Sequence, residues 1–376
     1  MADRYAIALS EKQGEQGIKD LSLRIKTFFP KHIRFLFTFF TPGFNAHTVL
    51  KTINFTLHPE AMVGIQSPAL IYEDRIIPRG IAAFCVNSET VQRREQIITS
   101  DEPQRVETSL RELTRATPAV GEKRPLLAFL PSQFSPRSYL RGAELALGRF
   151  SPLYGAGYVS TLLTKHCKCM GGSYQEGIQH LFFRGQEIVP HTIQGFFPLG
   201  KPFTVTRTIQ EKNVIIEING EPAEKLYEHY LEEKFEAFKQ HRLFKLYPLG
   251  INAHGATKLL HVADILDDGS LVCVGNVASR CRGHLMFLDP STDFEIIPGA
   301  LSPIKKHGGG VLFVVNSLLR KRILKDHAHE EIKTIKNALG PAFRMIGFYS
   351  DYALFPDTQA QRIDWNVGNI FSMLWK

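Results

Sequence analysis

The sequence predicts a mixed α/β protein, built from repeated strand–helix–strand units whose mixed sheets are flanked by helices. Two observations support this prediction. Short apolar runs rich in Val, Ile and Phe alternate with amphipathic stretches, and one order of events recurs three times along the chain. A strand–helix–strand unit places both strands in one sheet through a right-handed crossover. We expect the strand that closes each unit to run antiparallel to the other two.

The three units are expected at about residues 33–88, 125–185 and 310–374. In each, an apolar strand leads through a loop into a helix with apolar residues three and four apart, as at Tyr139 and Ala143. A second strand then ends in the pattern Gly-x-x-Ser, which we expect at one structural position in all three units. These pairs are Gly64 with Ser67, Gly157 with Ser160, and Gly347 with Ser350.

The segment between the second and third units has a different pattern. It predicts strands at residues 203–218, one amphipathic helix at 223–242, and a hairpin at 257–276 that turns at Asp267-Asp-Gly269. The polar segment 89–123 predicts a helix and a linker. We expect a first domain at 1–240, with the first two units and strands 203–218, and a second domain at 241–376, with the hairpin and the third unit.

Composition excludes several classes of protein. The chain has 376 residues, of which 44% are hydrophobic and 22% charged, values typical of a globular protein with about two domains. Its net charge of +8 comes from small separate basic clusters, which favour a solvated surface over a nucleic-acid site. We expect neither a signal peptide nor a membrane span. Together with five dispersed cysteines, this predicts a cytoplasmic protein.

Four segments together resemble a known family. Residues 62–70, 195–206, 217–223 and 345–350 look like motifs of the FIST N-terminal and C-terminal domains, in the family's order. This resemblance implies a cytoplasmic sensory module of bacterial signalling proteins that binds a small molecule; some stand-alone members resemble haem-binding nitric-oxide sensors. The chain departs from the family at His261, where Arg is frequent, and at Asn316, where Cys is frequent.

The Gly-x-x-Ser pairs are the main candidate binding residues. Glycine lets a ligand approach the backbone, and a hydroxyl three residues later can hydrogen-bond it. Strand ends of open α/β sheets commonly gather ligands, although glycine can also relieve crowding between a helix and a sheet. The predicted ligand-binding set adds Thr206, His261, Phe348 and Tyr349 to Gly64, Ser67, Gly157, Ser160, Gly347 and Ser350.

Other chemistries find little support. Ser67 lacks the trailing glycine of a nucleophile elbow, and no histidine is tied to these serines by pattern. The glycines 308–310 precede a strand, whereas a dinucleotide site needs them after one. His166, Cys167 and Cys169 form one metal-type cluster, but structural zinc usually needs a second pair. Haem has candidate ligands in several histidines, which the sequence does not separate: His191, His254, His261 and His284.

The sequence therefore predicts a small-ligand-binding sensory protein rather than an enzyme. We expect the ligand between the first two units and the third, where domain interfaces often hold pockets. Occupancy would shift the conformation and reach a signalling partner. Two alternatives stay open, namely a haem-binding gas sensor and an interaction scaffold without a ligand.

Overall fold

The three repeat units form three separate six-stranded sheets in a computed structural model. It describes residues 5–29, 33–87, 92–115, 126–131, 133–148, 152–157, 166–170, 173–184, 188–231, 234–253, 256–275, 277, 279–357 and 362–376. The mixed α/β class is confirmed. Among the described residues, no helix is long and apolar enough to cross a membrane.

The first two units share one order of elements, in which a short hairpin precedes the closing strand. The first contains β1 (Tyr5–Ser10), α1 (Gly14–Phe28), β2 (Phe35–Phe40), α2 (Ala46–Leu57), β3 (Ala61–Gln66), β4 (Leu70–Tyr72), β5 (Arg75–Ile77) and β6 (Ile81–Val86). The second contains β7 (Gln92–Ile98), α3 (Pro103–Arg115), β8 (Leu126–Leu130), α4 (Pro136–Leu147), β9 (Leu153–Gly157), β10 (His166–Met170), β11 (Ser173–Glu176) and β12 (Ile178–Arg184).

The third unit is interrupted after its first strand. It contains β13 (Ile188–Ile193), α7 (Pro290–Ala300), α8 (Ser302–Lys305), β21 (Gly310–Ser317), α9 (Leu318–Leu324), η4 (Lys325–His327), α10 (Ala328–Leu339), β22 (Phe343–Ser350), β23 (Tyr352–Asp357), β24 (Arg362–Asn366) and β25 (Ile370–Trp375). The three units together, residues 5–193 and 290–376, are called the body here.

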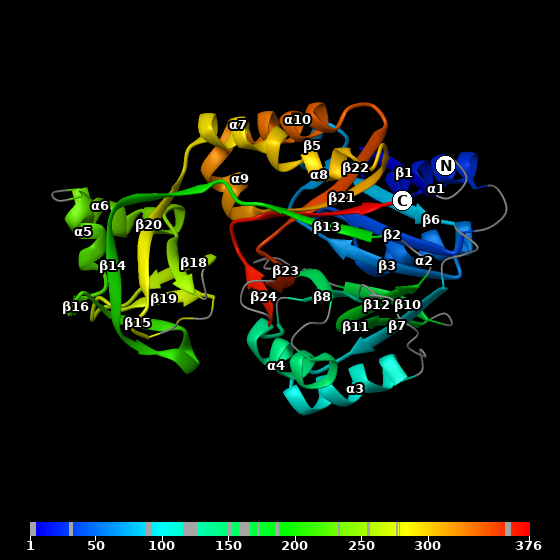
Figure 1. The fold of residues 1–376 in the computed structure, drawn as a ribbon. Coiled ribbons are helices and arrows are strands. Elements are labelled where there is room, and N and C mark those ends of the chain that lie inside the picture. Colours follow the sequence, from blue (N-terminus) through cyan, green and yellow to red (C-terminus); the bar gives the residue numbers. More distant parts are fainter. Residues whose placement is uncertain are drawn as a thin grey trace.

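Residues 196–288 form an inserted domain around one seven-stranded sheet. Its elements are β14 (Phe196–Ile209), η1 (Gln210–Lys212), β15 (Val214–Ile218), β16 (Glu221–Pro222), α5 (Lys225–Leu231), α6 (Phe235–Gln240), η3 (Leu243–Leu246), β17 (Leu249–Ala253), β18 (Ala256–Ile265), β19 (Leu271–Val274) and β20 (Arg282–Leu288). In Figure 1 this domain lies to the left of the body, and β14 and β20 carry the chain into it and back.

Each sheet of the body is completed by a hairpin from another unit. In every unit two strands joined by a helical connection run parallel, namely β2 and β3, β8 and β9, and β21 and β22. The closing strand pairs antiparallel with the earlier strand of each pair, as expected. Hairpin β4–β5 joins β22 of the third unit, β23–β24 joins β9 of the second, and β10–β11 joins β3 of the first. The three units are thus linked in a closed ring of exchanged hairpins.

The inner faces of the three sheets meet in an aromatic core. Phe37 lies between rings from all three sheets, with centroids 5.7 Å from Phe84, 6.4 Å from Phe129 and 5.8 Å from Phe313. Successive side chains of a strand point to opposite faces of the sheet, so every second residue of these strands points into the aromatic core. Helices α1 and α2 cover the outer face of the first sheet, whereas α3, α4 and α7–α10 cover the other two.

Three expectations for local structure are wrong. The segment expected as a basic loop after β21 contains helix α9, because Ser317 caps it by accepting hydrogen bonds from the backbone N–H groups of Leu319 and Arg320. The single helix expected at 223–242 is two short helices, α5 and α6. The polar segment 89–123 contains an edge strand, β7, besides helix α3.

The hairpin expected at 257–276 is confirmed, since β18 pairs antiparallel with β19. Its turn closes when Gly269 N–H donates to the carbonyl of Leu266, with Gly269 at a φ of 78° that glycine adopts readily. The domain boundary near residue 240 stays a prediction. The seven-stranded sheet draws strands from both sides of that position, because β14 pairs with β20.

Candidate functional site

Two of the predicted serines connect different units of the body. The hydroxyl of Ser67 donates to the carbonyl oxygens of Tyr349, at 2.7 Å, and of Ala69, at 2.9 Å. The hydroxyl of Ser350 is bonded in the same way, to the carbonyls of Gly157 and Tyr352. Both serines are buried and hydrogen-bonded to the backbone, which is the pattern of a structural hydroxyl.

Strand pairing shows which glycines occupy equivalent positions. Gly64 lies opposite Thr38, Gly347 opposite Val314 and Gly155 opposite Ala128 in the three parallel pairs. Ser67 bonds the residue two positions after Gly347, and Ser350 bonds the residue two positions after Gly155. In the second unit the equivalent glycine is therefore Gly155, and the match that pairs Gly157 with Gly64 and Gly347 is two residues out of register. Ser160 lies outside the described residues.

Phe348 and Tyr349 point to opposite faces of β22, and both are fully buried. The Phe348 ring joins the aromatic core, 5.6 Å from Phe39 and 5.8 Å from Phe313 between centroids. The Tyr349 ring lies on the helix-covered face, with Nζ of Lys321 5.9 Å from its centroid. Burial raises the pKa of the Tyr349 hydroxyl well above its usual value.

Thr206 and His261 lie apart from the serines, in the inserted domain. The Thr206 hydroxyl oxygen accepts a hydrogen bond from Gly220 N–H in the neighbouring turn, at 3.2 Å. His261, on β18, experiences the charge of Arg322 on α9 of the body. Of the predicted residues, His261 is thus the one at the junction between the inserted domain and the body.

A fully buried group of charged residues lies under α7 at this junction. Arg320 of α9 donates from Nε to Glu331 of α10, at 2.9 Å, and from Nη2 to Glu331 and to Asp293 of α7. Asn316, at the end of β21, donates to the second oxygen of Glu331 at 2.6 Å. All four side chains are inaccessible to solvent, so each carboxylate depends on Arg320 for its neutralising charge.

Two atoms of this group lack a hydrogen-bond partner among the described residues, namely Oδ1 of Asp293 and Nη1 of Arg320. Both face Gly195, which links β13 to β14: a β-carbon there would lie 1.8 Å from that oxygen and 2.9 Å from that nitrogen. Burial raises the pKa of Asp293 to about 6, although the charge of Arg320 opposes the shift. The group therefore lies directly against the chain that enters the inserted domain.

The outer side of α9 contributes a second charged group, called the junction site here: His261 of β18, Lys245 of η3 and Arg322 of α9. Helix α9 contacts η3, so the inserted domain and the body both contribute to it. The Nδ1 atom of His261 is buried without a partner among the described residues. Burial, followed by the charges of Arg322 and Lys245, lowers the pKa of His261 to about 4.

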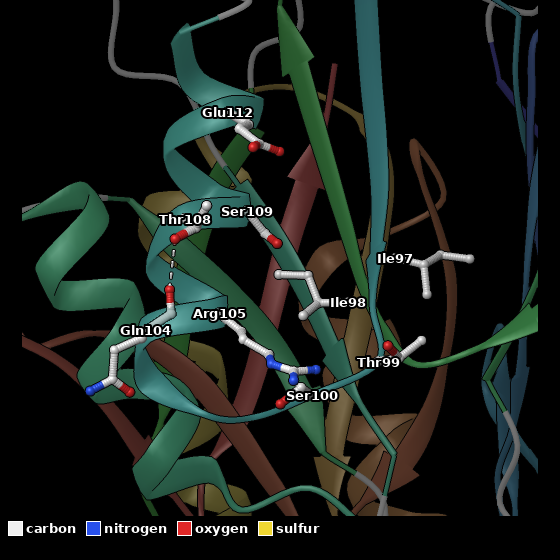
Figure 2. Close-up of a pocket in the computed structure, with 9 residues that line it drawn as sticks. All are labelled: Ile97, Ile98, Thr99, Ser100, Gln104, Arg105, Thr108, Ser109 and Glu112. Atoms are coloured by element: carbon white, nitrogen blue, oxygen red, sulfur yellow. Dashed lines mark hydrogen bonds between the residues drawn. The ribbon is translucent and has the colours of Figure 1, made fainter.

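A surface groove of about 400 Å³ lies between α3 and the end of β7. Figure 2 shows Arg105 and Ser109 of α3 facing the strand end, whereas Ile97 points to the far side of β7. Arg105 is paired with Glu102 at 3.0 Å, so the groove holds no unpaired cation. Sequence reasoning missed this groove because the charged start of β7 did not indicate a strand. Its lining is Ile97, Ile98, Thr99, Ser100, Gln104, Arg105, Thr108, Ser109 and Glu112.

Metal-type side chains do not cluster in the part of the chain that the structure describes. His166, Cys167 and Cys169 lie in β10, and the structure describes the backbone of these residues but not their side chains. Among the haem candidates, burial lowers the pKa of His191 as well as that of His261, and His254 is not described.

Family models match most of the chain. The FIST N domain matches residues 34–221, and the FIST C domain matches residues 223–351. The chain belongs to the FIST family. FIST domains are generally taken to be sensory domains that bind small ligands, and the family is not one of enzymes. A comparison with curated proteins found no match. The FIST C match includes all three residues of the junction site, but it ends before β23–β25, which complete two sheets of the body.

Proposed function

We propose that this FIST protein is a cytoplasmic sensor that binds a small ligand at the junction site and passes its occupancy to a signalling partner. The observation that carries the proposal is the composition of that site. His261 and Lys245 come from the inserted domain and Arg322 comes from the body. A ligand that contacts all three side chains spans the two parts of the protein.

Binding at such a place has a direct conformational consequence. A ligand shifts an equilibrium only when it prefers one of two states, and a ligand between two parts prefers the arrangement that brings its contacts together. The interface is closely packed with apolar side chains: a β-carbon at Gly368 of the body would lie 2.3 Å from Leu259 of β18 and 2.9 Å from Phe196 of β14. The inserted domain would be the moving part.

A non-catalytic role fits the described residues. Ser67 and Ser350 donate their hydroxyl hydrogens to backbone carbonyls, so neither hydroxyl is poised as a nucleophile beside a base. The same hydrogen bonds link the units of the body, relative to which the inserted domain would move.

A thermal-shift screen tests this function. Amino acids and small metabolites are added to the wild-type protein and to the variant Lys245→Gln/Arg322→Gln. We expect at least one compound to raise the melting temperature of the wild type and not that of the variant, because a ligand that binds only the folded state stabilises it. A compound that stabilises both proteins equally binds elsewhere and contradicts the proposed place. If no compound in a broad panel raises the melting temperature of the wild type, the result contradicts the sensor proposal itself and favours a scaffold.

A further inference from the structure

The inserted domain is joined to the body by two short linkers that lie side by side. Residues 194–195 connect β13 to β14, and Asp289 connects β20 to α7. The first residues of the domain beyond these linkers, Phe196 and Leu288, face each other in an antiparallel pair. A domain that the chain enters and leaves at one place can turn there as a unit. The two linkers are therefore a suitable position for a hinge.

Gly195, in the first linker, lies against a fixed part of the body. A β-carbon at Gly195 would lie 1.8 Å from Oδ1 of Asp293 and 2.9 Å from Nη1 of Arg320. Both side chains are inaccessible to solvent and belong to helices of the third unit. Glycine allows the chain to pass this close to the buried ion pair and still to change its backbone angles. The pivot thus stays in place while the domain beyond it can rotate.

Arg137 of the second unit holds the inserted domain at a second place. From the first turn of α4, its Nη1 atom donates to the carbonyl oxygen of Gln210 and, at 3.3 Å, to Oδ1 of Asn213. Gln210 begins η1 and Asn213 caps it, directly after the end of β14. Hydrogen bonds from a charged donor are stronger than those between neutral groups. The partly buried Arg137 side chain therefore ties the end of β14 to α4.

Both sides of this contact are firmly attached to their own part of the protein. In the body, Tyr139 of α4 is buried and hydrogen-bonded to His180 of β12, at 2.9 Å. In the inserted domain, the carbonyl oxygen of Asn213 accepts a hydrogen bond from Cys273 N–H of β19, at 2.9 Å. A pull on Asn213 therefore acts on the sheet of the inserted domain rather than on a loose loop.

Strand β14 separates the hinge from this contact. It has 14 residues, about 45 Å of strand, and runs from the linkers along the inserted domain to η1 (Figure 1). The apolar contact of Gly368 with Leu259 and Phe196 lies near the linkers, at the start of β14. A rotation that uncovers this contact moves η1 farther, because η1 lies at the other end of the strand. The bonds of Arg137 therefore oppose such an opening.

We propose that Arg137 is a latch that holds the inserted domain closed against the body, and that the domain opens by turning at Gly195 and Asp289 when this latch is released. The inference rests on the proposed function in taking the inserted domain as the moving part, and it adds the hinge and the contact that the movement breaks. Release of Arg137 uncovers the apolar interface and separates η1 from α4. The latch thereby couples the position of the inserted domain to the second unit, as a two-state element must do to transmit occupancy.

Thiol labelling of the whole chain tests the latch. Leu259→Cys places a thiol in the closed interface, where it reacts with N-ethylmaleimide only while the interface is open. In that background we expect Arg137→Gln to raise the labelling rate about tenfold, since the lost hydrogen bonds shift the closed and open populations by about that factor. The matched control Arg141→Gln removes an exposed arginine of the same helix and should leave the rate unchanged. Circular dichroism confirms that each variant is folded.

Asn213→Gly tests the same contact from its other side. Glycine keeps the positive φ of 53° at this position and removes the acceptor oxygen. We expect a smaller increase in labelling rate than in Arg137→Gln, because the carbonyl of Gln210 remains. In Arg137→Gln/Asn213→Gly the rate should equal that of Arg137→Gln alone, since both substitutions remove one shared contact. Two additive effects would show that the two residues do not act together.

Buried native cysteines separate opening from unfolding. Cys85 lies in the body and Cys273 in the inserted domain, and both are buried. Peptide mass spectrometry resolves their labelling from that of the introduced thiol. We expect their rates to be the same with and without Arg137→Gln. If Cys273 also reacts faster in that variant, the inserted domain unfolds instead of turning, and the hinge is wrong.

Acrylamide quenching of Trp365 gives a second readout that needs no introduced cysteine. Trp365 is buried on β24, which contacts both α4 and β18. Opening makes this ring accessible, so we expect stronger quenching in Arg137→Gln than in the wild type. With Trp365→Phe the remaining tryptophan is Trp375, fully buried in the aromatic core, and the increase should disappear.

Distinct results overturn the latch and the proposed function. If Arg137→Gln and Arg141→Gln are labelled at the same rate, the latch is wrong, whereas a compound that stabilises the protein in the thermal-shift screen would still support the sensor. If labelling follows the expected order but no compound of the screen binds, the hinge and the latch stand and the sensor is wrong.

Discussion

Oγ of Ser67 lies 2.7 Å from the carbonyl oxygen of Tyr349, a residue 282 positions later in the chain. The equivalent serine of the third unit, Ser350, makes the same contact to Gly157 of the second unit. Each bond therefore crosses between units at the point where a hairpin leaves for its neighbour's sheet.

Removal of either hydroxyl should destabilise the whole body. In Ser67→Ala or Ser350→Ala, buried carbonyls lose a donor, which we expect to cost about 1–3 kcal/mol of unfolding free energy. Urea denaturation followed by circular dichroism measures this cost. The control Ser302→Ala changes an exposed serine and should stay within about 0.5 kcal/mol of the wild type. A Ser67→Ala protein as stable as the control would show that the crossing bond contributes nothing.

Substitution of the three equivalent glycines should distinguish close backbone approach from ordinary packing. A β-carbon at Gly347 would lie 1.8 Å from the carbonyl oxygen of Val314, and one at Gly155 would lie 1.7 Å from that of Ala128. At Gly64 the nearest atom is Cδ2 of the flexible Leu50 side chain, at 2.7 Å. We expect Gly347→Ala and Gly155→Ala to cost more than about 3 kcal/mol, and Gly64→Ala to cost clearly less.

The measurement is the urea midpoint and the soluble yield of each glycine variant. Equal losses at all three positions would contradict the distinction between backbone and side-chain neighbours. A tolerated Gly155→Ala variant would contradict the close approach of a β-carbon there to the Ala128 carbonyl, which parallels that of Gly347 to Val314.

Asp293 should make stability fall as pH rises. Its pKa is raised from the ordinary 3.8 to about 6, so the folded protein binds this proton more tightly than the unfolded chain does. The corresponding contribution is fully present below the lower value and is lost as pH rises to the upper one. In Asp293→Asn, which keeps a neutral side chain of the same shape, this loss should be absent.

Urea denaturation of wild type and Asp293→Asn between pH 4 and 6.5 measures the difference between the two slopes. The control is Asp289→Asn, because hydrogen bonds from Thr292 and Ser291 lower the pKa of this helix-capping carboxylate. The control removes a contribution of opposite sign, one that is lost as pH falls. Identical slopes for wild type and Asp293→Asn would show that Asp293 is ionised in the folded protein at pH 5.

The segment that the family models match should not fold alone. A fragment of residues 34–351 lacks β1 and all of β23–β25, which leaves each of the three sheets of the body without at least one strand. We expect it to be insoluble or to unfold without cooperativity. A chain in which a flexible linker replaces residues 196–288 keeps all three sheets and serves as the comparison. Cooperative unfolding of the fragment would contradict the requirement for exchanged hairpins.

Sequence patterns predicted the elements of the units well, because alternation in strands and three-to-four spacing in helices are local properties. The register error in the second unit arose because Gly157, and not Gly155, is followed by a serine three residues later, whereas strand pairing places Gly155 opposite Ala128. Helix α9 was missed because Arg320 and Arg322 suggested a solvated loop. Arg320 is buried only through Asp293 and Glu331, which come from other helices.

The predicted site residues were harder to place, since partners far apart in sequence decide their environment. His261 sits among charges from η3 and α9, and neither contact is visible in the local sequence around it. The exchange of hairpins has the same character: nothing in residues 70–77 indicates that this hairpin joins a strand near residue 347. The ligand-binding roles of the predicted residues stay predictions until the experiments above are done.

The exchanged hairpins set an order on how the chain can fold during synthesis. The sheet built on β2 and β3 has its last strand at residue 176, halfway along the chain. The other two wait for residues 366 and 375, and β25, the final strand, occupies an interior place in its sheet. Until β24 and β25 have left the ribosome, Phe129 and Phe313 have no complete core to enter. A nascent chain therefore depends on strands β23–β25 to shield those rings.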